Sequence, residues 1–500
     1  MTGLRSNPGI QLNTKAYSPF DGLATLRPET NADLGQNQPW MTLNNAFVDS
    51  VGQVTLDRGA ELLVSTDPVQ HLNFYSSTGV VAAVLKGSGR IALTSDTGIS
   101  SNEIFTQFGS ISSVVFSRRV IFFQKALPPW EFDGTAYNPA LSASMRALGP
   151  AFATTSSRRL CVAGVPSSPT RVFLSRVDTA TTFIDDEADA ETSVLRAGYI
   201  DVANLLTSVD EISGLAPFEQ NRLCIFTKDR TFIFKIDPDI TAWSIEDRTN
   251  VNVGCISHNT IRPAGDDVLF CSRNGVHSVR RSRQNGIIVE SVTLSEPVKN
   301  LYRSLVRSMN DPSLISAVYD RDEAQYHIFF PQAGSNFTKR LTVTIPSDEK
   351  GTKFSTGDFL QARCGAFLGG NLIFGSPAGI FNVAPVSVSA TYEPTATAIT
   401  PMLWLGDISN NKRTHSMIVQ ASGQGTIDLE IFDENGLPLT TMSMEIDGTL
   451  DDNSYDGVPI IKQYERPFEY VVRGVRIKFT INGNGLVRLS GFAVRTRKEI

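Results

Sequence analysis

The stretch at residues 266–279, DDVLFCSRNGVHSV, consists of two short apolar runs on either side of Arg273, Asn274 and Gly275. Two apolar runs joined by a polar turn that contains glycine are typical of a β-hairpin. Glycine adopts positive φ without steric cost, so we expect Gly275 to supply the left-handed residue of this turn. The stretch therefore predicts paired strands as the building unit of the fold.

The same pattern, F-x-S-x-x-G-[VI], occurs at three places in the chain. Its residues are Phe74, Ser76 and Gly79, then Phe270, Ser272 and Gly275, and finally Phe374, Ser376 and Gly379. Residues 114–123 (VVFSRRVIFF) and 223–236 (LCIFTKDRTFIFKI) resemble this unit without its glycine. A strand unit that recurs along a chain is typical of a β-propeller. A large β-sandwich or barrel with similar hairpins is the alternative.

The pattern changes near residues 389–401 (SATYEPTATAITP), which are rich in Thr, Ala and Pro. The strands predicted beyond this point alternate between polar and apolar residues, and the dipeptides Asn435-Gly436 and Asn482-Gly483 are strong hairpin signals. We expect an all-β chain with three parts: an extended N-terminal lead at 1–40, a β-propeller of hairpin-type blades at 41–395, and a C-terminal antiparallel β-sandwich at 396–500.

One short amphipathic helix is expected at residues 294–310, LSEPVKNLYRSLVRSMN. Its apolar residues recur at helical spacing and form one stripe that would pack on the body of the protein. The stripe contains Val298, Leu301, Tyr302, Leu305, Val306 and Met309. Ser295 is the expected N-cap, and Pro297 is tolerated in the first turn.

The composition excludes several classes of protein. The 500 residues have a net charge of −6, and no basic stripe typical of a nucleic-acid-binding surface is present. No apolar run is long enough to cross a bilayer, and the polar N-terminus lacks a signal-peptide core. We therefore expect synthesis in a cytoplasm and no membrane span. The five cysteines lie far apart, and we expect them to be buried free thiols.

The sequence contains no pattern of catalytic, metal-binding or cofactor-binding residues. Its five histidines include no HExxH pair, and no nucleophile elbow, P-loop or dinucleotide-binding motif is present. We expect no enzyme activity and no cofactor. The acidic run at Asp185, Asp186, Glu187, Asp189 and Glu191 does not match a calcium-binding loop. It is a candidate lumen or surface acidic loop, and a solvated outer loop is the simpler interpretation.

Several motifs in a shared order resemble those of tail proteins from short-tailed bacteriophages. Residues 41–63 (MTLNNAFVDSVGQVTLDRGAELL) resemble the start of such a protein, in which the pattern would be carried by Asn45, Gly52, Val54, Asp57, Arg58 and Gly59. The segments DEISGLAPFEQNRLCIFTKDRTFIFKI, VGCISHNTIRPAGDDVLFCSRNGVHSV and LSEPVKNLY follow in the expected order, and KRTHSMIVQASG and RLSGFAVRTR resemble the C-terminal β-domain. The chain thus resembles the tail nozzle, also called the tail hub or DNA-stabilisation protein.

The resemblance implies a structural virion protein built around a β-propeller. Copies of the chain would form a ring, expected to be a hexamer, below the portal and its head-tail adaptor. This ring would extend and close the DNA ejection channel, let DNA pass without sequence-specific binding, and anchor tail fibres or spikes. The expected location is the tail of the virion. The alternative is a soluble β-propeller that binds a glycan or a protein, with glycoside hydrolase activity as one version of it.

Overall fold

The computed structural model confirms an all-β chain that combines a β-propeller with a largely antiparallel β-sandwich. The structure describes residues 12–18, 20–23, 38–49, 52–65, 68–74, 81–85, 90–94, 101–103, 109–133, 137–139, 143–180, 182–183, 196–206, 209–219, 221–237, 239, 242–245, 252–279, 293–332, 338–345, 351–368, 370–383, 392–405, 410–448, 461–483 and 487–497. The described chain divides into two compact units, each of which is treated by itself below.

The boundaries of the two units differ from the expected ones. The propeller unit comprises residues 62–341 and 360–383, whereas the sandwich unit comprises residues 1–61, 342–359 and 384–500. The expected lead at 1–40 and the start of the expected propeller at 41–61 are therefore parts of the sandwich unit. The physical reason is strand pairing, because β1 (Leu12–Tyr17) runs antiparallel to β41 (Arg488–Arg497) and completes its sheet.

Five four-stranded sheets form blades of the propeller. In the first four, the strands follow one another in chain order, as expected of consecutive hairpins. They are β8 (Val69–Phe74), β9 (Val81–Leu85), β10 (Arg90–Thr94) and β11 (Ser101–Glu103); β12 (Ile111–Phe116), β13 (Arg119–Gln124), β14 (Trp130–Phe132) and β15 (Tyr137–Pro139); β16 (Phe152–Ser156), β17 (Arg159–Ala163), β18 (Arg171–Leu174) and β19 (Gly198–Asp201); and β20 (Ile212–Phe218), β21 (Arg222–Thr227), β22 (Thr231–Lys235) and β23 (Ser244–Ile245).

The fifth four-stranded blade joins the two ends of the propeller. It contains β31 (Cys364–Leu368), β32 (Asn371–Ser376) and β33 (Gly379–Val383), and its outermost strand is β7 (Glu61–Ser65). The strand that precedes the first blade is thus hydrogen-bonded to the last strand of the unit. This pairing closes the ring of blades.

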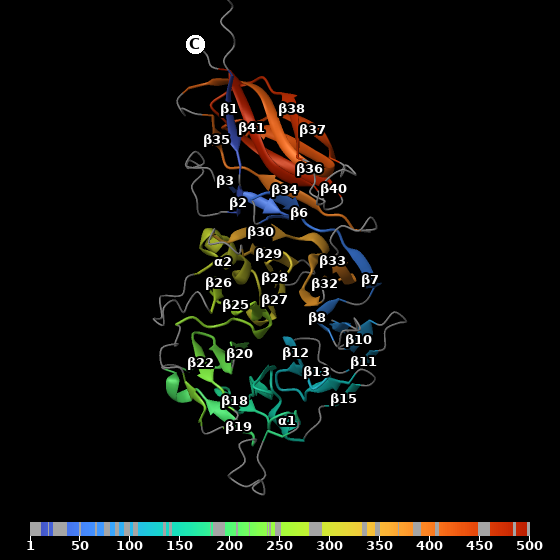
Figure 1. Cartoon of the computed structure of the whole chain (residues 1–500), viewed down its shortest axis with the longest axis vertical. Coiled ribbons are helices and arrows are strands. Elements are labelled where there is room, and N and C mark those ends of the chain that lie inside the picture. Colours follow the sequence, from blue (N-terminus) through green and yellow to red (C-terminus); the bar gives the residue numbers. More distant parts are fainter. Residues whose placement is uncertain are drawn as a thin grey trace, which may run out of the picture. The chain divides into compact units, whose positions relative to one another are not determined.

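Two more sets of strands lie in the chain between the β20–β23 blade and the β31–β33 blade. One is a three-stranded sheet of β24 (Arg262–Ala264), β25 (Asp267–Cys271) and β26 (Val276–Ser278). The other set is β27 (Ser316–Asp320), β28 (Gln325–Pro331) and β29 (Thr338–Thr344), which are hydrogen-bonded in that order. β24 contacts β27, β27 contacts β31, and β31 contacts β8, so the succession of blades returns to its start. Figure 1 shows this circle as a change of colour from blue at β8 through green at β20 to orange at β32.

The recurrent sequence pattern marks a hairpin in each of two blades. In the β25–β26 hairpin, the Ser272 hydroxyl accepts hydrogen bonds from the backbone N–H groups of Asn274 and Gly275, at 3.0 and 3.1 Å. In the β32–β33 hairpin, the Ser376 hydroxyl accepts one from the backbone N–H of Ala378 at 3.0 Å. Serine therefore stabilises both turns by bonding the backbone N–H two residues ahead.

The expected role of glycine in this pattern is wrong at Gly275. Gly379 has φ +142°, but Gly275 is not among the residues of positive φ. A Cβ atom at Gly275 would instead lie 2.4 Å from the Ser295 hydroxyl and 2.4 Å from the Thr293 methyl group. A glycine is needed at position 275 because residues 293–295 pass so close to the turn that a side chain there would overlap them. Sequence alone did not show this approach.

The expected amphipathic helix is present but shorter than residues 294–310. A 3₁₀ turn, η6 (Glu296–Val298), leads into α2 (Lys299–Arg307), and both Tyr302 and Leu305 are buried. Ser295 does not cap the helix, because its hydroxyl accepts a hydrogen bond from the backbone N–H of Val276 in β26 at 3.0 Å. The Tyr302 hydroxyl donates to the Ser272 carbonyl at 2.6 Å, so the helix is held against the hairpin turn. A second short helix, α1 (Ala143–Leu148), lies between the second and third blades in the chain.

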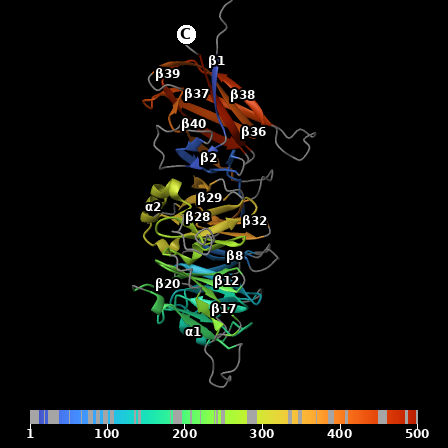
Figure 2. The same cartoon turned by 60° about the vertical axis from the view of Figure 1, so that its left-hand side comes forward.

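The sandwich unit is organised around one long strand, β36 (Lys412–Phe432), that belongs to two sheets. Its first half pairs with β38 and β41, and its second half pairs with β37 and β40. Figure 2 labels β37, β38 and β40 together with β36. The described strands of the unit are β1, β2 (Phe20–Leu23), β3 (Gln38–Trp40), β4 (Thr42–Asn44), β5 (Ala46–Val48), β6 (Val54–Leu56), β30 (Lys353–Gly357), β34 (Thr395–Ile399), β35 (Leu403–Trp404), β36, β37 (Pro438–Gly448), β38 (Lys462–Pro467), β39 (Val471–Val472), β40 (Gly474–Gly483) and β41.

An aromatic cluster connects the N-terminal strands of the sandwich unit with its C-terminal strands. Phe492 of β41 stacks on Tyr17 of β1 at 4.9 Å between ring centroids and lies 5.2 Å from Phe479 of β40. Trp40 of β3 meets Phe20 at 4.9 Å and Phe479 at 5.7 Å. All five rings are buried, which explains why the N-terminal segment folds with this unit.

We predict that Gly275→Val destabilises the propeller by about 1–3 kcal/mol, because the added side chain overlaps Ser295 and Thr293. Gly351→Val is the matched control, since nothing lies within 4 Å of a Cβ there and its φ is not positive. Urea denaturation of both variants checks this. Equal midpoints for the two variants would contradict the packing argument.

Candidate functional site

The central channel of the propeller contains a cavity of about 220 Å³. Its walls come from the innermost strands β8, β24, β27 and β31, from Ser113 of β12, and from the 3₁₀ turn η4 (His258–Thr260). These strands belong to different blades, so the ring alone brings their side chains together. The lining residues are His71, Leu72, Asn73, Phe74, Ser113, His258, Asn259, Arg262, Pro263, Val318, Tyr319, Arg321, Gly365, Ala366 and Phe367.

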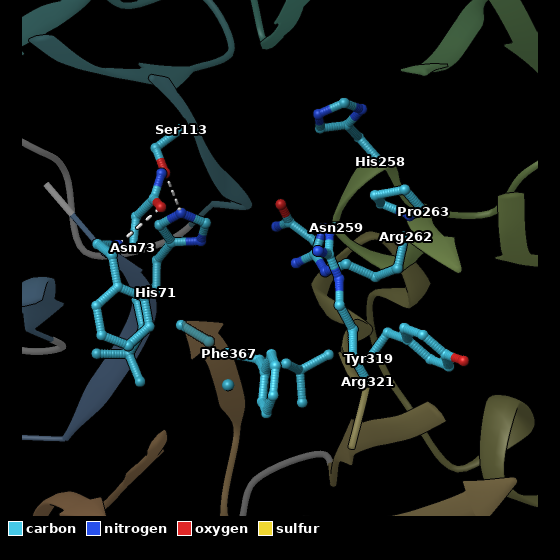
Figure 3. Close-up of a pocket in the computed structure, with 15 residues that line it drawn as sticks. His71, Asn73, Ser113, His258, Asn259, Arg262, Pro263, Tyr319, Arg321 and Phe367 are labelled. Atoms are coloured by element: carbon cyan, nitrogen blue, oxygen red, sulfur yellow. Dashed lines mark hydrogen bonds between the residues drawn. The ribbon is translucent and has the colours of Figure 1, made fainter. Parts of the chain in front are cut away.

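A polar network on one wall connects the first two blades. The Ser113 hydroxyl lies 2.7 Å from His71 Nε2 and accepts a hydrogen bond from Asn73 Nδ2, also at 2.7 Å. Figure 3 shows His71, Asn73 and Ser113 grouped on one side of the cavity. His71 and Asn73 are two residues apart in β8 and therefore face the same side of the strand.

The 3₁₀ turn η4 lines part of the channel, and residues of three blades form hydrogen bonds or ring contacts with it. Asn259 Nδ2 donates to the Ser110 hydroxyl and to the Ile111 carbonyl, at 3.1 and 2.8 Å. His258 stacks on Phe152 of β16 at 4.8 Å, and its Nδ1 accepts a hydrogen bond from the Leu215 backbone N–H in β20 at 3.3 Å. Because Nδ1 accepts this hydrogen bond from Leu215, the proton of neutral His258 is on Nε2.

Arg262 supplies a positive charge close to these groups. Its Nε donates to the Ala317 carbonyl at 2.7 Å, and its Nη1 donates to the Ile261 carbonyl at 2.9 Å. Burial lowers the pKa of Arg262, and no carboxylate pairs with it in the described part of the chain. Arg321, just after β27, also lines the cavity (Figure 3).

Both histidines of the cavity are neutral at physiological pH. Burial, and after it the nearby charge of Arg262, lowers the pKa of His71 to about 3. The same two causes, in the same order, lower the pKa of His258 to about 3. The cavity therefore combines neutral imidazoles with two guanidinium groups, and these imidazoles do not act as proton acceptors near pH 7.

A second cavity, of about 320 Å³, is lined by residues at the starts of the innermost strands β12, β16 and β20 and also by His258. Its described lining contains two lysines and two carboxylates, Lys125, Lys228, Glu211 and Asp311, and Glu211 pairs with Lys125 at 3.2 Å and with Lys228 at 2.8 Å. The hydrogen bonds from Lys228 and Lys125 lower the pKa of Glu211. This carboxylate is therefore charged and paired, which does not suit it to act as a general acid.

Most of the described residues singled out in the sequence do not line the central cavity. Phe270 packs on Phe226 and on His277 in its own part of the ring, and Phe374 packs on Phe329. Phe74, at the end of β8, is the one described residue of the pattern that lines the cavity. Ser76 and Gly79 lie outside the described residues, as do Asp185, Asp186, Glu187, Asp189 and Glu191.

The cysteines have the structural role expected of them, and two of the histidines also have structural contacts. All five cysteines are free and buried, and burial raises the pKa of Cys161, Cys271 and Cys364 to about 12. His277 Nε2 lies 2.9 Å from the Ser272 hydroxyl, and His327 packs edge-on against Phe374. Cys161, Cys271 and Cys364 therefore remain protonated thiols at neutral pH and are not available as nucleophiles.

Sequence reasoning missed the cavity residues because they are far apart in the chain. His71, His258 and Arg262 have no shared spacing, and only the closure of the ring places them together. The available signal was weak: polar residues at alternate positions of an otherwise apolar strand, as at His71 and Asn73. In the described ranges, no three His, Cys, Asp or Glu side chains are grouped as metal ligands. No helix among the described residues has the length and apolar character of a membrane span.

No protein-family model and no curated protein sequence matches the chain. Among solved structures, the chain is similar to YCF48 from Cyanidioschyzon merolae, with a TM-score of 0.36, 11% identity and coverage of 65% of this chain and 99% of that one. It is also similar to BamB from Moraxella catarrhalis, with a TM-score of 0.34, 10% identity and coverage of 69% and 92%. A structure of YCF48 bound to D1 peptide gives a TM-score of 0.37, 8% identity and coverage of 66% and 94%.

We predict that His71 makes the propeller less stable in acid. Its pKa is about 3 in the fold and near 6.5 when unfolded, so between these values the unfolded chain binds a proton that the fold does not. Stability should fall as the pH is lowered from 6.5 toward 3, by up to about 1.4 kcal/mol per pH unit for this imidazole. His71→Gln should have a shallower pH dependence in urea denaturation. His415→Gln removes an exposed histidine and should keep the original slope; identical slopes for all three proteins would contradict the assignment.

Proposed function

We propose that the chain is a structural virion protein that forms the nozzle of a short bacteriophage tail. The resemblance in motif order suggests this role, and an all-β fold with a propeller is the fold that the resemblance implies. A closed propeller and a sandwich provide rigid β scaffolds, and the loops between blades are free to bind partners. In this role, the chain acts by assembling with other proteins and not by catalysis.

The observation that supports the proposal most is the structural role of the motif on which the resemblance rests. Asn45 has φ 54°, and its amide Nδ2 donates to Asp358 Oδ1 at 2.9 Å and to the Thr395 carbonyl at 3.2 Å. Its Oδ1 accepts hydrogen bonds from the backbone N–H groups of Asp358 and Phe359. Asparagine tolerates the left-handed backbone conformation, and Asn45 makes all four of these hydrogen bonds. The motif therefore stabilises the fold of the sandwich unit.

Copies of the chain would then form a ring, as a hexamer, against the head-tail adaptor, with fibres or spikes bound on its outside. A ring requires two different surfaces that pair head to tail and close. DNA would pass through the lumen of this assembly without sequence-specific contacts, in keeping with a net charge of −6. The site of action would be the virion tail after synthesis in the host cytoplasm.

A second candidate function is that of a soluble binding propeller, with a glycan or a protein as its ligand. The central cavity favours this candidate, because channel-lining groups from several blades converge in it (Figure 3). A hydrolase version would need two carboxyl groups placed across a substrate. No Asp or Glu is among the described residues that line the cavity of about 220 Å³.

The decisive experiment is to purify tailed particles from the source and to quantify this chain against the major capsid protein by mass spectrometry. The nozzle proposal predicts a low and fixed ratio that corresponds to one ring per particle. A binding propeller that is not part of the virion would be absent from intact particles after extensive washing. Its absence from particles with complete tails would overturn the nozzle proposal.

A further inference from the structure

Arg262 is partly buried, and its guanidinium has an incomplete set of partners among the described residues. Nε and Nη1 bond the backbone carbonyls of Ala317 and Ile261, and no described group bonds the remaining amino group, Nη2. Both acceptors are neutral, so the charge has no counterion from the described residues. A positive charge that is partly shielded from water and lacks a counterion attracts an anion, which makes this position a candidate for an anion site.

The rest of the cavity has the character of an anion site. Arg321 lines it together with Arg262, and among the described residues no carboxylate forms an ion pair with Arg321. Figure 3 labels both arginines among the residues around the cavity. The two histidines on the walls are neutral and therefore offer no competing charge of either sign. An anion that enters would meet two positive charges and no described carboxylate.

Size and wall chemistry restrict the kind of anion. About 220 Å³ is below the roughly 300–1,000 Å³ of sites for drug-sized ligands, so the ligand is small. Pro263, Val318, Ala366 and Phe367 give part of the wall an apolar surface. An inorganic anion would leave this surface uncovered, whereas an organic acid would place its carbon skeleton against it.

We propose that the central cavity of the propeller binds a small organic carboxylate, with its carboxyl group between Arg262 and Arg321. The carboxylate accepts hydrogen bonds from Arg262 Nη2 and from the Arg321 guanidinium, and the apolar wall contacts its carbon atoms. An organic acid and the carboxyl group of an acidic sugar share this chemistry. The proposal is independent of the nozzle function, since it concerns one chain and its own channel.

The test is isothermal titration of the full-length protein with succinate, galacturonate, inorganic phosphate and sodium chloride at constant ionic strength. Succinate represents an organic acid and galacturonate an acidic sugar, so their relative affinities distinguish the two sources. Saturable binding of at least one carboxylate is expected, with phosphate and chloride weaker by a factor of ten or more. No saturable binding of either carboxylate, or equal binding of chloride, would overturn the proposal.

Three variants locate the site. Arg321→Gln removes an exposed positive charge and should weaken carboxylate binding about tenfold with an unchanged melting temperature. Arg262→Lys keeps a positive charge but loses backbone hydrogen bonds, and it should weaken binding further at some cost in stability. Arg273→Gln removes an exposed arginine from the β25–β26 turn, which does not line the cavity, and should bind as the unmodified protein does. Equal affinity of Arg321→Gln and Arg273→Gln would contradict the assignment even if Arg262→Lys failed to fold.

Discussion

The pairing of β7 with the β31–β33 sheet is the constraint on which the propeller depends. Each blade has too little apolar surface for a core of its own, and the clusters of buried residues extend from one blade to the next. Such an arrangement is stable only if it has no open ends. β7 precedes all the blades in the chain, and its hydrogen bonds to the last sheet join the first and last parts of the unit.

The closed ring also creates the central cavity. His71 and Asn73 come from the first blade, Arg262 from the middle of the chain and Phe367 from the last blade. Their positions relative to one another follow from the ring and not from local sequence. Arg262, whose partners are neutral backbone groups, is tolerated in this place because it is only partly buried and its charge faces the channel, where solvent or an anion replaces the missing counterion.

Sequence patterning was informative about strands and less informative about how distant segments meet. The 266–279 hairpin and the Asn435-Gly436 turn are local structures, and both are present; Gly436 has φ 80°. Asn482-Gly483 was misread as a hairpin turn, because both residues are still paired with β36, at Thr426 and Gly425. The turn signal was overridden by strand pairing within the sandwich unit.

The same limit explains the incorrect domain boundaries and the missed site. Nothing in the sequence of β1 indicates that its partner is β41, almost five hundred residues away in the chain at Leu12 and Arg497. Likewise, Gly275 looked like a residue of positive φ because local turn chemistry was the only visible reason for a glycine. Its actual constraint, the close approach of Ser295 and Thr293, is a tertiary contact.

Closure of the ring is tested most directly by proline substitution in β7. Successive backbone N–H groups of a strand point in opposite directions, so one of Leu63→Pro and Val64→Pro removes a hydrogen bond to the last sheet and the other does not. Amide hydrogen exchange of β31–β33 and β8 is the measurement. Ring closure predicts faster exchange throughout both blades in one of the two variants, with a loss of roughly 3 kcal/mol. Unchanged exchange of both blades in both variants would contradict a propeller held closed by this strand.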